Sequence, residues 1–137
     1  MHTVLIVEDD DCFQYLCKVV FERSGLPYRL LYASDGMEAF EVIETHEGSI
    51  DLILLDINMP RMNGHEFLEE YARRNPGEIP MIAMLTTSDQ KGDREIALQY
   101  SFVRDYIVKP LTEDHVRRFD QHFESLGIAK HNEAASI

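Results

Sequence analysis

Acidic, hydroxyl and basic side chains stand directly after four short apolar segments of this chain. They are Glu8, Asp9, Asp56, Thr86 and Lys109. If the four segments are neighbouring strands about 5 Å apart, these side chains share one pocket. Carboxylates this close repel one another by on the order of several kcal/mol, so the group needs a cation or a raised carboxylate pKa. Oxygen ligands without histidine or cysteine favour a hard ion, and an incomplete protein shell that keeps bound water favours Mg²⁺.

The segments that must position these side chains alternate between strand and helix patterns. Apolar runs of strand length lie at 3–7, 28–33, 51–55, 80–85 and 104–108. Helical spacing of apolar residues is found before Gly25, after Gly36, and over 64–74, 89–101 and 112–126. Asp10 or Asp11 is expected to cap the first of these helices. Five strand–helix repeats predict an α/β fold, a parallel sheet with right-handed crossovers and helices on both faces.

Such a sheet has its functional residues at the carboxyl ends of its strands. The acidic, hydroxyl and basic side chains stand at those ends, so the periodicity and the residue types indicate the same site. Acids also gather at helix N-termini, where they cap, and any single one of them is explained that way. Helix capping does not explain why four strand ends carry chemically matched side chains.

Composition and charge exclude several classes of protein. The 137 residues suffice for one domain, since a domain takes about 100–200 residues. The net charge of −12 argues against direct binding to nucleic acid or to anionic membranes. The apolar runs are too short to cross a bilayer, and the N-terminus lacks the pattern of a secretory signal, so we expect a cytoplasmic protein. A nucleotide site lacks its glycine-rich phosphate cradle.

The chain resembles the receiver, or phosphoacceptor, domain of two-component response regulators over essentially residues 3–126. The matching stretches are Val4–Asp10, Leu54–Gly64, Leu85–Ser88 and Tyr106–Pro110. The most specific feature is the Asp–x–x–Met–Pro–x–x–x–Gly spacing from Asp56 to Gly64, with an acid pair before it and Lys-Pro after it. The resemblance implies a flavodoxin-like, doubly wound sheet of five parallel strands in the order 2-1-3-4-5 with five helices. It places the receiver domain at 1–126 and a flexible tail at 127–137.

The resemblance also implies the chemistry of the site. Asp56 is the expected phosphoacceptor, whose carboxylate attacks the phosphohistidine of a histidine kinase or histidine phosphotransfer protein. Asp9 and Asp56 are expected to bind Mg²⁺, with Glu8 holding metal-bound water and the backbone carbonyl of Asn58 as a further ligand. Mg²⁺ and Lys109 then offset the charge of the transferring phosphoryl oxygens.

Switching is expected to use a hydroxyl and an aromatic side chain. Thr86 is expected to hydrogen-bond a phosphoryl oxygen, after which Tyr106 swings inward and changes the face made by the fourth helix, fifth strand and fifth helix. The fourth strand holds one residue more than receivers usually have, so Thr87 stays open as the alternative hydroxyl. The segment 102–105 replaces the Gly-Ala that is common in receivers, so the loop before Tyr106 is atypical.

The expected function is that of a stand-alone response regulator rather than an enzyme, with self-catalysed phosphoryl transfer and slow autodephosphorylation. Its output is contact with a downstream protein or onward phosphotransfer, and phosphorylation-dependent homodimers stay open. One alternative is a phosphatase or phosphotransferase with an aspartyl nucleophile. Haloacid-dehalogenase enzymes, however, carry a second Asp two residues after theirs, where this chain has Asn58. The other alternative is a protein-binding scaffold that is not phosphorylated.

Overall fold

Strands and helices alternate along the chain in the computed structural model, which describes residues 1–74, 81–87 and 91–127. The strands are β1 (His2–Val7), β2 (Tyr28–Ala33), β3 (Leu52–Leu55), β4 (Met81–Thr86) and β5 (Val103–Val108). The helices are α1 (Asp11–Arg23), α2 (Gly36–Thr45), α3 (Gly64–Arg74), α4 (Lys91–Leu98) and α5 (Glu113–Ser125). Every strand pair is parallel and the order is β2-β1-β3-β4-β5, which confirms the predicted doubly wound sheet.

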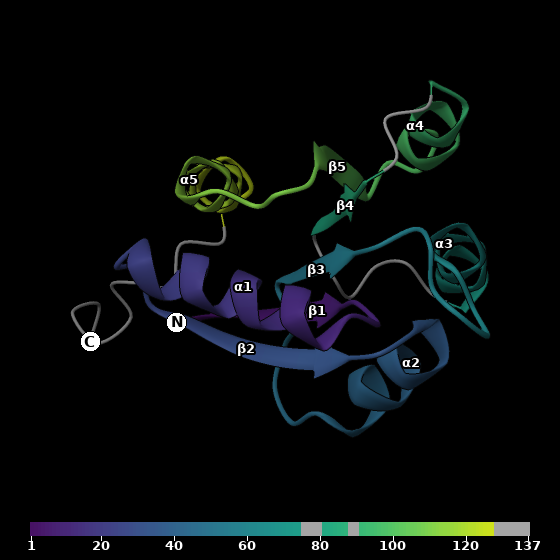
Figure 1. Ribbon diagram of the computed structural model, residues 1–137, viewed down its shortest axis with the longest axis horizontal. Coiled ribbons are helices and arrows are strands. Elements are labelled where there is room, and N and C mark those ends of the chain that lie inside the picture. The colour runs from purple at the N-terminus through teal and green to yellow at the C-terminus, as the bar shows by residue number, and fades with distance from the viewer. Residues whose placement is uncertain (75–80, 88–90, 128–137) are drawn as a thin grey trace.

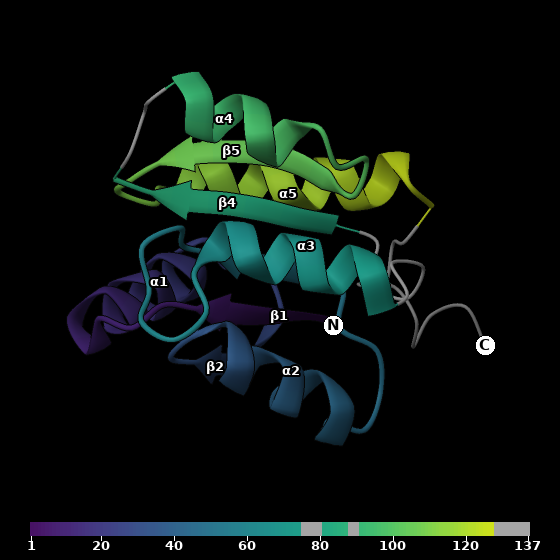
Figure 2. The ribbon, with the colours of Figure 1, turned by 90° about the vertical axis from the view of Figure 1, so that its right-hand side faces the viewer.

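The sheet has a helical layer on each face. Helices α1 and α5 cover one face, and α2, α3 and α4 cover the other (Figures 1 and 2). All residues of β1, β3 and β4 are buried, as continuous apolar runs require. Successive side chains point to opposite faces, so Leu5 joins the cluster with Phe67 of α3, whereas Ile6 joins the cluster with Phe119 of α5. The three central strands are therefore held from both sides, and their carboxyl ends form one fixed edge.

Helices with side-chain N-caps follow β1, β2 and β5. Of the two acids considered as caps for α1, Asp10 is the cap, and its carboxylate accepts the Phe13 amide at 3.2 Å. Because the helix starts only at Asp11, Glu8 and Asp9 stay in the turn at the end of β1. Among the described residues, no helix has the length and apolar character that a bilayer span requires.

Several predicted boundaries differ from the structure by one residue or more, and the differences at the fourth strand and the fourth helix lie nearest the predicted site. The fourth strand extends to Thr86, one residue beyond the predicted end, because Thr86 still pairs with Val108 of β5. The predicted helix at 89–101 is observed as Lys91–Leu98, and residues 88–90 lie outside the described residues. It ends early because the amides of Gln99 and Tyr100 donate to carbonyls three residues back, which closes a tighter turn. Of the predicted tail at 127–137, residues 128–137 also lie outside the described residues.

Candidate functional site

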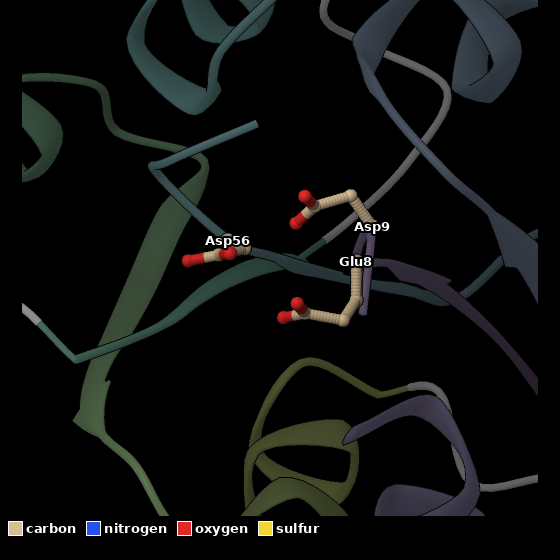
Figure 3. A group of neighbouring side chains, drawn as sticks. All are labelled: Glu8, Asp9 and Asp56. Carbon is tan, nitrogen blue, oxygen red and sulfur yellow. The ribbon is translucent and has the colours of Figure 1, made fainter. Parts of the chain in front are cut away.

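Three carboxylates meet at the carboxyl edge of the sheet. In the register of β1 and β3, Val7 lies opposite Leu55, so Glu8 and Asp56 leave their strands side by side. The Asp56 amide donates to the Val7 carbonyl at 3.1 Å and extends this pairing by one residue. One carboxylate oxygen from each of Glu8, Asp9 and Asp56 lies within 4.8 Å of the other two. In Figure 3, the side chains of Glu8 and Asp9 extend from the end of β1, and their carboxylates lie on the side that faces Asp56.

A lysine from the far edge of the sheet reaches this cluster. The Nζ atom of Lys109 lies 2.7 Å from Glu8 Oε2 and 3.7 Å from Asp56 Oδ2. The backbone amide of Lys109 donates to the Thr86 carbonyl at 2.8 Å, and the bond from Lys109 to Pro110 is cis. The ring of Phe13 covers the ammonium, with Nζ 3.9 Å from the ring centroid. Lys109 is therefore held among two carboxylates and an aromatic face.

Burial dominates the electrostatics of the two inner carboxylates. Burial raises the pKa of Glu8 to about 7. The hydrogen bond from Lys109 lowers this pKa, whereas the negative charge of Asp56 raises it further. Burial also raises the pKa of Asp56, although Lys109 and the amides of Ile57 and Asn58 oppose it. One ammonium thus does not fully compensate the desolvated carboxylates. A second cation binding here would lower both pKa values.

A glycine allows the chain to turn closely around Asp56. The Gly64 amide donates to the Ile57 carbonyl at 2.8 Å, which brings the start of α3 against the end of β3. A Cβ atom on Gly64 would lie 2.5 Å from the Asp56 carbonyl oxygen, too close for any other residue without a backbone shift. The Ile57 amide donates to Asp56 Oδ1 at 2.8 Å and orients the carboxylate. The Asp56 to Gly64 spacing therefore has a structural reason.

The remaining predicted site residues lie around this edge in different environments. Thr86 is fully buried at the end of β4, whereas Thr87 is exposed. Asn58 is exposed two residues after Asp56. Tyr106 is half-buried in β5, with the guanidinium carbon of Arg94 4.8 Å from its ring centroid.

Sequence reasoning missed three contacts of the site. Phe13 has the spacing of a core residue of α1, and nothing in the pattern indicates that its ring meets Lys109. Gln14 donates from Nε2 to the Glu8 carbonyl at 2.6 Å, again without a sequence signal. Arg61 pairs with Asp35 of the turn before α2. Their opposite charges allow this pairing, but nothing in the sequence around Asp56 indicates it.

Comparisons with known proteins agree with this geometry. The family model of the response regulator receiver domain matches residues 4–119 of this chain. The chain is 31% identical over 119 residues to the probable methanogenesis regulatory protein FilR2 of Methanothrix harundinacea, which covers 84% of this chain and 76% of that protein. It is 34% identical over 113 residues to the transcriptional regulatory protein CpxR of Escherichia coli, which covers 82% of this chain but 45% of CpxR.

Solved structures show the same fold. A two-component response regulator from Legionella pneumophila superposes with a TM-score of 0.79 at 25% identity, over 91% of this chain and 99% of that one. The receiver domain of the sensor histidine kinase PA1611 from Pseudomonas aeruginosa has a TM-score of 0.72 at 30% identity, over 88% of this chain and 95% of that one. That structure has a magnesium ion coordinated in its active-site cleft.

Proposed function

The chain belongs to the response regulator receiver domain family, and from this membership we propose that it accepts a phosphoryl group on Asp56 from a phosphohistidine. One observation carries the proposal: Asp56 is the carboxylate that lies within reach of both the acid pair of β1 and the ammonium of Lys109. A nucleophile in this position has groups that offset charge on two sides.

The proposed step is a phosphoryl transfer between two side chains. A carboxylate oxygen of Asp56 attacks phosphorus, the P–N bond to the partner's imidazole breaks, and the imidazole leaves and takes up a proton. The product at Asp56 is an acyl phosphate. Because a carboxylate is a weak nucleophile in water, the rate must come from orientation and charge compensation. The Ile57 amide orients the carboxylate, and Lys109 compensates charge on the phosphoryl oxygens.

The donor set fits Mg²⁺. Glu8, Asp9 and Asp56 supply oxygen atoms alone, and the carbonyl of Asn58 is proposed as the further ligand. The raised pKa values of Glu8 and Asp56 indicate that this cluster has too little positive charge of its own. The magnesium ion in the PA1611 receiver structure supports the same assignment. When bound, the ion supplies further neutralisation of phosphoryl oxygens.

The proposed output is a switch, rather than turnover of a substrate. Thr86 is the proposed hydroxyl, since it is buried in the row of strand ends while Thr87 faces solvent. Tyr106 lies on β5 under Arg94 of α4, so its movement would alter the contact between these two elements. The proposed partners are a histidine kinase or histidine phosphotransfer protein and a downstream protein that binds the face of α4, β5 and α5. The proposed location of this chain is the cytoplasm.

Labelling with acetyl phosphate and Mg²⁺ tests the proposal. Intact-protein mass should show one phosphoryl adduct on the wild type and none on Asp56→Asn. Asp11→Asn is the matched control, because Asp11 is an exposed acid at the start of α1 that does not belong to the group of Glu8, Asp9 and Asp56. Equal labelling of Asp56→Asn and the wild type would refute the assignment and would favour a different acceptor.

A further inference from the structure

We propose that the ion pair between Asp35 and Arg61 positions the segment 57–63, here called the acceptor loop, for metal binding at Asp56. The inference rests on the function proposed above. The pair joins two turns that are far apart in sequence, the one between β2 and α2 and the one between β3 and α3. The Nε atom of Arg61 donates to Asp35 Oδ2 at 2.6 Å.

The carboxylate of Asp35 is buried and uses both oxygens. Its side chain is 4% exposed, and Oδ1 accepts the Glu38 amide at 2.9 Å as the cap of α2. Burial pushes its pKa upward, but the Glu38 amide and the Arg61 guanidinium outweigh burial and hold the pKa below its usual range. Loss of Arg61 would leave a buried oxygen without its donor, which is costlier than the loss of an ordinary surface pair.

The backbone of the acceptor loop depends on the same contact. Arg61 has φ +62°, in the left-handed region that non-glycine residues rarely adopt, so its neighbours must hold it there. Beside it, the Gly36 amide donates to the Met62 carbonyl at 3.2 Å. A Cβ atom on Gly36 would lie 2.7 Å from Met62 Cγ, so the two turns are in close contact. The ion pair and this hydrogen bond therefore fasten the loop to the turn before α2.

The acceptor loop carries the proposed backbone ligand. Asn58 lies two residues after Asp56. Beyond it, the contacts with Asp35 and Gly36 and the Gly64 amide hold the loop, together with the buried side chain of Met59. Mg²⁺ demands near-ideal octahedral geometry at about 2.0–2.1 Å, so a small displacement of a carbonyl weakens binding. Arg61 thus acts through the position of Asn58 and touches no reacting atom, which makes it a positioning residue.

The sign of the effect separates positioning from simple electrostatics. Arg61 is a positive charge near a cation site, so its charge alone opposes Mg²⁺ binding, and its removal would tighten binding. Loss of positioning has the opposite effect and weakens binding. A measured decrease in affinity after removal of Arg61 therefore cannot come from its charge.

The test compares two arginine variants of the full chain. Arg61→Ala removes the ion pair, and Arg117→Ala is the matched control, because Arg117 is similarly exposed (56% against 57%) and also pairs at 2.6 Å, with Asp114. In the metal-free protein, hydrogen exchange at the Gly36 amide should become about tenfold faster in Arg61→Ala and stay unchanged in Arg117→Ala. In a titration followed by amide chemical shifts, Mg²⁺ affinity should fall about tenfold in Arg61→Ala alone. Arg61→Lys should restore part of the lost protection of the Gly36 amide and part of the lost Mg²⁺ affinity.

Two results would overturn the proposal: unchanged Gly36 exchange in Arg61→Ala, or Mg²⁺ affinity equal to or above that of the wild type. A wild-type chain without any response to Mg²⁺ would instead refute the proposed function. The exchange measurement needs no metal, and it would still decide whether the ion pair holds the acceptor loop.

Discussion

The ammonium of Lys109 lies 1 Å nearer to the carboxylate of Glu8 than to that of Asp56, at 2.7 Å against 3.7 Å. Lys109 is thus paired mainly with a proposed metal-binding group and not with the proposed acceptor. A cation that takes over the charge of Glu8 would leave Lys109 available to the phosphoryl group on Asp56. Lys109 and the proposed Mg²⁺ would therefore share the same carboxylates, and this sharing determines how we expect variants at the site to behave.

Lys109→Ala should affect metal binding and labelling in opposite directions. Mg²⁺ affinity should rise, since a competing positive charge is gone from the cluster. The rate of labelling by acetyl phosphate should fall about 100-fold, because a charge-compensating donor is lost in the transition state. Mg²⁺ titration and initial labelling rates measure the two effects. Lys18→Ala, which removes an exposed lysine paired with Glu22, is the control and should leave both unchanged.

Mg²⁺ binding should depend on pH through Glu8. Its pKa of about 7 in the metal-free protein means that a proton competes with the cation below that pH. Affinity should rise by about tenfold per pH unit below 7 and level off above it, since binding then displaces no proton. Glu8→Gln has no proton to displace and should flatten this dependence. A wild-type affinity that is constant from pH 6 to pH 8 would contradict the prediction.

Gly64→Ala should destabilise the chain, because its Cβ would meet the Asp56 carbonyl oxygen at 2.5 Å. We expect the free energy of unfolding in urea to fall by about 1–3 kcal/mol, as for other overpacked sites. Gly92→Ala is the control. Gly92 lies in α4, and its added Cβ has no described atom within 4 Å apart from its chain neighbours and the backbone of its own helix. Alanine should therefore raise the stability there by about 0.5–1 kcal/mol. Equal effects of the two substitutions would show that the turn around Asp56 is not tight.

The two neighbouring threonines should respond differently. Thr86→Ala should still be labelled at Asp56 but should show a reduced spectral change from α4 to α5 when beryllofluoride is added. The lost hydrogen bond to a charged group contributes about 1.5–3 kcal/mol, enough to shift the switch equilibrium about tenfold or more. Thr87→Ala should behave as the wild type. The reverse pattern in the amide spectra would assign the switch to Thr87.

The sequence predicted the parts of the site that follow from strand periodicity. Glu8, Asp9 and Asp56 stand at strand ends, and a parallel sheet brings such ends together whatever the loops do. The exact end of β4 was not predicted, because pairing with β5 adds Thr86 to the strand. Contacts across loops were also missed: the ring of Phe13 over Lys109 and the pairing of Arg61 with Asp35 depend on how separate turns pack, which no local pattern encodes.

Chemical trapping of the acyl phosphate is the most direct test of whether Asp56 carries the phosphoryl group. After incubation with acetyl phosphate and Mg²⁺, borohydride reduces an aspartyl phosphate to homoserine, and peptide mass spectrometry locates the converted residue. We expect homoserine at position 56 alone, in amounts that rise with the phosphoryl adduct on the intact chain. Conversion at Asp9, Asp10 or Asp51 with position 56 unchanged would contradict it.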